Sequence, residues 1–455
     1  MKNDEKLGTA PLGRLMLSLA LPTVLAQLIN VLYNIIDRIY IGHMPGEGNL
    51  ALTGVGVTFP IITLIAAFSA FAGAGGAPLA AIELGRRDRK KASAIMGNSA
   101  LMLVFFSVVL TVGLLIFKLP ILYAFGASTR TIGYADDYIT VYLLGTVFVQ
   151  LALGLNTFIS GQGAAKPAMM SVLIGAVLNI VLDPFFIFAL NMGVRGAAVA
   201  TVISQFVSAC WVVHFLRSAR SVLHLELVHP DKALLGRIAA LGIAPFVMQA
   251  TESLVTITFN SGLQHYGGDL YVGSMSILMS VMQLIVIPVN GITQGVQPII
   301  SYNYGAGNAS RVENAVLRLI AVCLLGTLLL AGVAILFPAV YASLFTSDSR
   351  LISLTCSVMP VFFTGIAIFG IQAACQSTFL ALGQARISLF IAMLRKIILL
   401  VPLAIILPKF LGVRGIYIAE PVSDVTSVLV TGTLFVFTIR RILNEMRQKN
   451  DQTSK

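Results

Sequence analysis

Long apolar runs separated by short polar segments repeat along the whole chain. Each run holds about 20 residues or more with few charged side chains, and a helix of that length, at roughly 1.5 Å per residue, crosses the roughly 30 Å hydrocarbon core of a bilayer. The pattern therefore predicts transmembrane helices. Twelve such runs are present, at about 15–39, 52–80, 92–117, 138–160, 168–190, 197–216, 238–263, 270–301, 319–343, 354–381, 387–408 and 415–439.

The composition leads to the same conclusion. Hydrophobic residues make up 57% of the chain and charged residues 11%, with a mean hydropathy of +0.91. Soluble globular domains carry about 25% charged residues, so the sequence predicts an all-α polytopic membrane protein. The first run is expected to remain in the protein, because it is too long for a secretory signal and lacks a small-residue cleavage site.

The placement of Lys and Arg orients the chain. With the N-terminus inside, 21 of the 30 basic residues fall on the inner side, six on the outer side and three in or at the edge of the runs. Because cytoplasmic loops carry the excess of basic residues, both termini are expected in the cytoplasm, with the protein in the cell inner (plasma) membrane. The net charge of +11 does not indicate nucleic-acid binding, since these residues lie in short loops without a soluble domain.

The chain reads as two copies of one unit. The tetrapeptide GVRG at 193–196 recurs at 412–415, and the same offset of about 220 residues relates Pro78 and Gly85 to Pro298 and Gly305. Each copy holds six runs, an even number, so the copies are expected to be parallel repeats. The predicted divisions are an N-lobe at 1–217, a cytoplasmic linker at 218–236, a C-lobe at 237–440 and a cytoplasmic tail at 441–455.

One aspartate interrupts the fifth run. Asp183, in the segment VLNIVLDPFFIF, is the only ionisable residue between Lys166 and Arg195. A carboxylate inside a bilayer costs at least about 2.5–3.5 kcal/mol, so an intramembrane acid indicates a function. The following Pro184 has no N–H to donate to the carbonyl of Ile180, which leaves that oxygen free beside the acid.

Further polar residues of the first copy are expected at a similar depth. Asn179 precedes Asp183 by one helical turn, as Tyr33 precedes Asp37 in the first run, and Thr201 follows in the sixth. Together they form a group of hard oxygen ligands suited to a proton or Na⁺. Alternatives remain open, because Asn179, Thr201 and Tyr33 could form helix–helix hydrogen bonds and Asp37 could pair with the adjacent arginine at the interface.

The second copy carries charges of both signs within its runs. Glu420 and Asp424 lie one turn apart, opposite Arg395 and Lys396 of the preceding run. Arg395 and Asp424 are expected to form a structural ion pair. Glu252 has no obvious partner and is therefore the better candidate for contact with a substrate or a coupling proton.

Other motifs indicate packing rather than chemistry. Glycine-rich FAGAGGAP at 71–78 lies within a run and is expected to allow close helix contact, since the chain has no Gly-Lys-Ser/Thr sequence for nucleotide binding. The four cysteines show no metal-like or redox spacing. We expect no cofactor and no enzyme site. Amide side chains that are candidates to line a cavity are Gln249, Gln283, Asn290, Gln294, Gln297, Gln372 and Gln376.

Four segments resemble the multidrug and toxic compound extrusion (MATE) family, especially its MepA-like branch. They are YNIIDRIYIG at 33–42, GQGAAKP at 161–167, NIVLDPFFIF at 179–188 and GVRGAAVAT at 193–201, and the resemblance covers the whole chain. It implies a V-shaped pair of six-helix bundles that exports cationic amphipathic compounds in exchange for Na⁺ or H⁺.

The resemblance also implies roles for particular residues. In DinF-like members the cation site of the N-lobe corresponds to Asp37, Asn179, Asp183 and Thr201 of this chain. NorM-like members use an acid in the seventh span, which Glu252 matches, and another in the tenth. The segment 351–385 contains no acid, so a NorM-like site in the second copy is not expected.

The sequence thus predicts a monomeric antiporter in the lipid bilayer that exports small organic cations and drugs. Asp183, assisted by Asp37, would bind the coupling cation, with Na⁺ a candidate ion at Asp37, Asn179, Asp183 and Thr201. A flippase for lipid-linked precursors is the alternative within transport, although an acid-rich interior does not favour it. A membrane enzyme is the alternative from another class, and the chain lacks a nucleophile–base pair or metal-ligand set for it.

Overall fold

The computed structural model describes residues 3–44, 48–226 and 228–453, and these residues form helices without any strand. Eleven of the described helices are long and apolar enough to cross a membrane, and one bent pair makes a twelfth if it is counted as a single span. The chain is therefore an all-α polytopic membrane protein, which confirms the fold class predicted from the apolar runs.

The helices follow the predicted runs closely in both halves. The first half comprises α1 (Asn3–Thr9), α2 (Leu12–Gly42), α3 (Gly48–Gly85), α4 (Arg89–Ala124), α5 (Ile132–Leu144), α6 (Thr146–Gly161), α7 (Ala165–Pro184), a π-helical segment (Phe185–Ala189) and α8 (Gly193–Arg217). The second half comprises α9 (Lys232–Tyr266), α10 (Asp269–Gly305), α11 (Ala309–Leu336), α12 (Pro338–Phe345), α13 (Ser349–Ala381), α14 (Ala385–Met393), a second π-helical segment (Leu394–Leu400), α15 (Val401–Ile406), α16 (Pro408–Leu411) and α17 (Val413–Thr453).

Some boundaries differ from the predicted ones. The ninth run was placed at 319–343, but α11 ends at Leu336 and the short α12 begins at Pro338, because proline cannot continue the hydrogen-bond ladder of α11. The last helix continues beyond residue 440 to Thr453, so most of the predicted tail extends this helix. Residues 1–2 and 45–47 of the predicted N-lobe, 227 of the linker and 454–455 of the tail lie outside the described residues.

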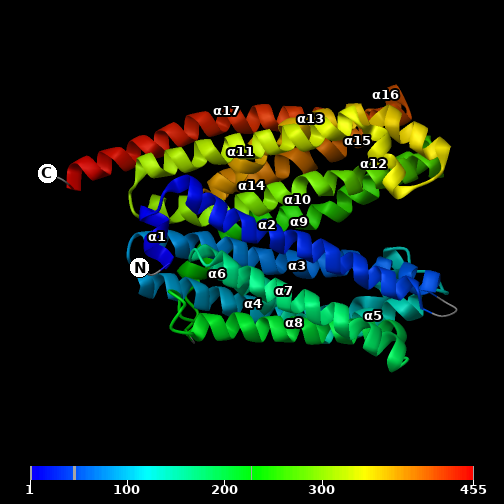
Figure 1. Cartoon of the computed structure of the whole chain (residues 1–455), viewed down its shortest axis with the longest axis horizontal. Helices are drawn as coiled ribbons and strands as arrows, with labels where there is room; N and C mark the ends of the chain where they lie inside the picture. The colour runs from blue at the N-terminus through cyan, green and yellow to red at the C-terminus, as the bar shows by residue number, and fades with distance from the viewer. Residues whose placement is uncertain (1–2, 45–47, 227, 454–455) are drawn as a thin grey trace.

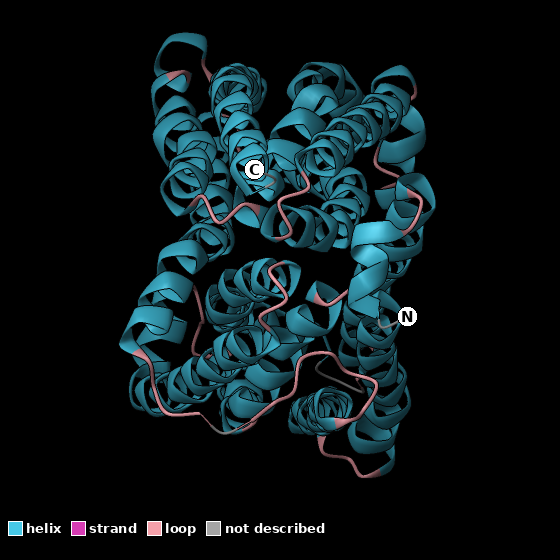
Figure 2. Ribbon diagram, turned by 90° about the vertical axis from the view of Figure 1, so that its left-hand side faces the viewer, coloured by secondary structure: helices cyan, strands magenta, loops and turns pink. Residues whose placement is uncertain are grey.

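Two bundles of helices lie side by side along the long axis of the molecule. Figure 1 shows α2 to α8 in one bundle and α9 to α17 in the other, with both chain ends at the same end of the molecule, here called the terminal end. The view from that end separates the helices into two groups (Figure 2). The bundles approach each other near the terminal end and diverge toward the far end (Figure 1).

Glycines related by the sequence repeat join the two bundles. A Cβ added at Gly85 of α3 would lie 1.9 Å from the carbonyl oxygen of Tyr302, and one added at Gly305 of α10 would lie 1.9 Å from the carbonyl oxygen of Ile82. The offset of about 220 residues that relates the two glycines also relates Ile82 to Tyr302. The contact is thus nearly symmetric between the two copies.

Further contacts between the two bundles also lie nearer the terminal end than the far end. A Cβ at Gly242 of α9 would meet the carbonyl oxygen of Phe71 at 1.9 Å. The Thr23 hydroxyl donates to the carbonyl oxygen of Gly291 at 2.6 Å, so α2 is held against α10. The glycine-rich segment 71–78 therefore allows close helix packing, partly within its own half and partly across the interface.

The two GVRG tetrapeptides perform the same structural task. Gly193 and Gly412 have φ values of +56° and +59°, which favour glycine. Three residues later, a Cβ at Gly196 would lie 2.7 Å from the carbonyl carbon of Phe186, and one at Gly415 would lie 2.5 Å from that of Leu407. Each motif thus ends a connection and lets the next helix pack closely against the preceding segment.

The connection between the halves is anchored to the first half. The side-chain oxygen of Gln162 accepts hydrogen bonds from the backbone N–H groups of Val222 and Leu223, at 2.6 and 3.2 Å. The Asn98 side chain accepts another from the N–H of Asp231 at 2.9 Å. Part of the segment predicted as a linker is therefore fixed against α4 and α6.

Candidate functional site

The polar residues of the fifth and sixth runs meet in the interior of the first half. Asp183 of α7 is fully buried and Asn179, one turn earlier, is 2% exposed. The Asn179 amide donates to Asp183 Oδ1 at 3.1 Å and to the Thr201 hydroxyl of α8 at 3.3 Å. The spacing of four residues therefore places both side chains on one helix face, and Asn179 links Asp183 to α8.

Asp37 of α2 joins this group from the opposite side. It is buried, and its carboxyl group lies within hydrogen-bonding reach of that of Asp183. The neighbouring Arg38 points elsewhere, with its guanidinium carbon 5.2 Å from the centre of the Phe59 ring. Arg38 still interacts electrostatically with Asp37, but the two side chains do not form the direct ion pair that was the alternative left open by the sequence.

Tyrosines of α2 and α5 surround the two acids. Tyr33 lies one turn before Asp37 and close enough to interact with it electrostatically. Tyr138, which the sequence analysis missed, is 4% exposed and contacts Thr201. Its ring stacks on that of Tyr142 with centroids 6.2 Å apart. The spacing of these two tyrosines, one helical turn within an apolar run, is a signal that could have identified them.

The cluster leaves several oxygens without partners. Asp37 Oδ1, Asp183 Oδ2 and Asn179 Oδ1 are buried and accept no hydrogen bond. Such oxygens are costly in an apolar interior unless a cation or proton neutralises them. Two carboxylates and an amide oxygen are suitable ligands for Na⁺ or acceptors for H⁺, so the donor set fits a monovalent coupling cation. No group of three or more His, Cys, Asp or Glu suited to a metal occurs among the described residues.

A small cavity with several polar side chains in its wall adjoins the cluster. Its volume is about 30 Å³, enough for one or two water molecules at about 10–15 Å³ each. Tyr33, Asn179 and Thr201 contribute to its wall. The other polar side chains that line it are Asn30, Asn156, Ser171, Ser204, Gln205 and Ser208. The amide of Asn179 and the hydroxyl of Thr201 therefore border a space large enough for water.

A break in helical geometry follows directly after the acid. The regular helix α7 ends at Pro184, and residues Phe185–Ala189 continue as a π-helical segment in which the N–H of Leu190 donates to the carbonyl of Phe185. Proline has no N–H for a regular helical bond, and π segments commonly occur at functional sites. The sequence predicted an effect of Pro184 on the backbone but not this form of it.

The second half contains a separate charged group. Arg395, in the second π-helical segment, donates from Nε to Asp424 Oδ1 at 2.6 Å and from Nη2 to Glu420 Oε1 at 2.9 Å. The guanidinium carbon lies 4.4 Å from the centre of the Phe369 ring. The ion pair expected between Arg395 and Asp424 is present, and Glu420 shares the same guanidinium.

Glu252 requires a correction. The sequence analysis found no obvious partner for it, but in the structure it forms an ion pair with Lys396, which also donates to the carbonyl oxygen of Met248 at 3.0 Å. The sequence analysis missed this pair because α9 and the π-helical segment are far apart in the chain and become neighbours only after folding. The Glu252 side chain is 55% exposed and that of Lys396 only 11%.

The predicted amides do not gather at one site. The Gln372 side chain accepts a hydrogen bond from Ser427 at 2.7 Å and so contributes to packing between α13 and α17. The Gln376 amide donates to the Ser388 hydroxyl and so contributes to packing between α13 and α14. Gln283 is exposed on α10. Gln294 accepts from Gln27 across the interface between the halves at 3.1 Å.

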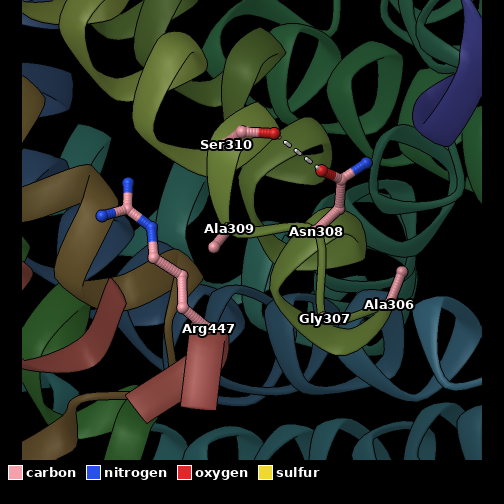
Figure 3. A pocket seen from close by; sticks show the side chains of 6 residues that line it. All are labelled: Ala306, Gly307, Asn308, Ala309, Ser310 and Arg447. Atoms are coloured by element: carbon pink, nitrogen blue, oxygen red, sulfur yellow. Dashed lines mark hydrogen bonds between the residues drawn. The ribbon is translucent and has the colours of Figure 1, made fainter. Parts of the chain in front are cut away.

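A larger hollow lies away from both groups of acids. It measures about 430 Å³ and is lined by residues 306–310, between α10 and α11, together with Arg447 of α17 (Figure 3). Arg447 also forms an ion pair with Glu313 at 2.6 Å. This hollow is at the terminal end and contains no acid of the candidate cation site.

Comparisons with known proteins agree with this architecture. A family profile described as MatE matches residues 22–185 and again 245–406, about 220 residues later. "Multidrug export protein MepA" of Staphylococcus aureus (strain MRSA252) is 26% identical over 434 residues, which cover 92% of this chain and 94% of that protein. A solved structure described as a MATE in the bent conformation has a TM-score of 0.92 at 24% identity, covering 98% of this chain and 99% of the other. An outward-facing multidrug resistance MATE family transporter has a TM-score of 0.89 at 24% identity, over 97% and 99%.

Proposed function

The chain belongs to the MATE family, a family of transporters rather than enzymes, and from this premise we propose that it exports cationic amphipathic compounds in exchange for H⁺ or Na⁺. The similarity to a relative named as a multidrug export protein supports drugs as the substrate class. Export would proceed by alternating access, in which two lobes, residues 1–217 and 237–440, rock about a space between them.

The observation that carries the proposal is the buried pair of Asp37 and Asp183 with an unpaired oxygen on each. Together with Asn179 and Thr201, these residues would hold the coupling cation. A bound H⁺ or Na⁺ supplies the positive charge that the two carboxyl groups lack. Its release on one side of the membrane would leave like charges within hydrogen-bonding reach, which favours a change in helix arrangement.

The orientation is part of the proposal. The terminal end, with both chain ends and the connecting segment, would face the cytoplasm, because the basic loops gather there. The contacts across Gly85, Gly242 and Gly305 then close the cytoplasmic side. The conformation described here would accordingly be open toward the outside, and the protein would act as a monomer.

Glu252 is the proposed contact for the positive charge of the substrate. Among the three acids of the charged group in the second half it has the most exposed side chain, at 55%, against 2% for Glu420 and 0% for Asp424. An exposed carboxylate can exchange its partner at low cost, whereas a buried one cannot.

Transport in proteoliposomes tests the proposal, with Na⁺ and pH gradients imposed separately and ethidium as the probe. We expect one of the two gradients to drive ethidium movement, and Asp183→Asn to lower its rate by about tenfold or more. Glu445→Gln serves as the control, because it removes an acid whose side chain is 57% exposed at the surface of α17. Vesicles that translocate a lipid-linked sugar but no organic cation would instead support a flippase.

A further inference from the structure

Five charged side chains of the second half form two ion-paired groups that interact electrostatically, here together called the C-half charge network. Glu252 comes from α9, Arg395 and Lys396 from the second π-helical segment, and Glu420 and Asp424 from α17. Arg395 contacts both acids of α17, while Lys396 contacts Glu252. Glu252 is the proposed contact for the substrate, but the proposed function gives no role to the other four side chains.

The charges of the network do not balance. The pair of Lys396 and Glu252 is neutral, but the single guanidinium of Arg395 faces two carboxyl groups. Gly365 and Gln372 of α13, which pack against α17 here, are uncharged, and α10 has no charged residue between Asp269 and its end at Gly305. Fully ionised, the network would therefore hold one excess negative charge in an apolar interior, which is strongly unfavourable.

Unpaired atoms mark the position of this excess charge. Glu420 Oε2 and Asp424 Oδ2 are buried and have no hydrogen-bond partner, while the other oxygen of each binds Arg395. Two carboxyl groups that share one counter-ion commonly share one proton as well. The acids of α17 thus have a place for one additional positive charge.

Lys396 is the group able to supply that charge in place of a proton. It interacts electrostatically with Glu420 as well as with its present partner Glu252. Its flexible stem carries a single rotatable ammonium, whereas Arg395 is fixed by two hydrogen bonds and by stacking on Phe369.

The geometry points to a proton-for-lysine exchange in the C-half charge network. Glu420 and Asp424 share one proton while Lys396 pairs with Glu252, and an organic cation bound at Glu252 releases Lys396 to replace that proton. The proton leaves to water. The network gains one positive charge with the substrate and loses one with the proton, so its net charge does not change. This inference rests on the proposed export of organic cations and adds a second coupling site to it.

Infrared spectroscopy of the purified full-length protein tests the exchange, because a protonated carboxyl group has a C=O stretching band that a carboxylate lacks. The background is Asp37→Asn/Asp183→Asn, so that the acids of the first half do not contribute. The signal is the part of this band that disappears in Glu420→Gln, where one acid and Arg395 balance without a proton.

The Glu252 and Lys396 variants then test whether the proton depends on the position of Lys396 or is held only because the acids are buried. Glu252→Gln leaves Lys396 without its partner, so we expect Lys396 to neutralise the α17 acids and the band to be lost. Glu252→Gln/Lys396→Met removes that cation, and the band should return. If Glu420→Gln fails to fold, the signal is instead the part of the band that differs between Glu252→Gln and Glu252→Gln/Lys396→Met in the same background.

Ethidium provides the substrate arm of the experiment. Added to the background protein, it should remove the band as Glu252→Gln does, with about one proton released per bound cation. A band that is absent from the background, persists in Glu252→Gln or fails to return in the double variant would overturn the exchange. Ethidium that the wild-type protein transports but that leaves the band of the background protein unchanged would also overturn it. If the variants behave as expected but vesicles move no organic cation, the export proposal alone fails.

Discussion

At the scale of single residues, the position of the unpaired oxygens separates a cation site from ordinary helix packing. Asn179 and Thr201 form the interhelical hydrogen bond that a structural role requires. Asp37 and Asp183 differ, because each keeps a buried oxygen without a partner. Evolution toward stability alone would favour a satisfied or apolar pair here, since a half-satisfied polar group is costly.

Asp183→Asn is expected to remove coupling without removing the fold. The amide keeps the size and much of the hydrogen bonding of the carboxyl group but cannot bind a proton or balance Na⁺. Gradient-driven ethidium export in proteoliposomes should fall by about tenfold or more, equivalent to at least about 1.4 kcal/mol. Asn179→Ala and Thr201→Ala should show milder losses, with Asp37→Asn between them.

Expression and the thermal unfolding midpoint of the same proteins serve as the control. If the Asp183→Asn protein exports ethidium at the wild-type rate, this acid is dispensable. A variant that no longer folds would make it structural, and the coupling site would then be sought at Glu252.

Glu252→Gln should weaken the export of cationic substrates more than that of neutral ones. Because the side chain is more than half exposed, its charge contributes at most about 1 kcal/mol, or about a fivefold rise in the apparent substrate constant for cations. Initial export rates of a cationic and a neutral substrate over a concentration series measure the effect. An equal loss for both substrates would contradict a direct charge contact.

At the scale of helices, breaks in regular geometry position the chemistry. A π-helical segment follows Asp183 in the first half, and another carries Arg395 and Lys396 in the second. Both are followed by a GVRG tetrapeptide whose last glycine allows close contact with the preceding residues. The repeat therefore preserves a way of bending a helix within each bundle, even though the charged residues differ between the copies.

Gly196→Val should disturb the segment after Asp183. The added side chain would meet the backbone of Phe186 within about 2.7 Å, and overpacking of this kind costs about 1–3 kcal/mol. We expect a lower thermal unfolding midpoint and reduced export. Gly113→Val is the matched control, because a Cβ at Gly113 of α4 has no neighbour within 4 Å. Equal midpoints for the two variants would show that the close contact at Gly196 is not required.

At the scale of the whole molecule, duplication produced an interface that is nearly symmetric. Gly85 approaches Tyr302 while Gly305 approaches Ile82, and the repeat relates the members of each pair. Backbone contacts without side chains between them can separate and re-form with little loss of interdigitated packing. This suits two bundles that alternate between closure at one end and closure at the other.

Gly242→Val should weaken closure at the terminal end. A Cβ there would lie 1.9 Å from the carbonyl oxygen of Phe71, so the two helices have to separate. We expect greater labelling of a cysteine introduced at the terminal end of α9 and slower export. Gly236→Val, on the same helix with nothing within 4 Å, is the control. Unchanged labelling relative to that control would contradict a role for this contact in closure.

The sequence by itself determined the helical membrane fold, the positions of nearly all spans and the family. These follow from apolar runs, from the Asn179–Asp183 spacing and from the repeat, which are local or depend on a fixed offset. It did not determine the break at Gly145, where α5 and α6 meet at a bend of 59°, or the role of Tyr138. The tertiary structure alone decided which side chains meet across helices, as with Lys396 and Glu252. Hydropathy fixes which residues enter the bilayer, but the rotation of each helix about its axis depends on packing against all of its neighbours.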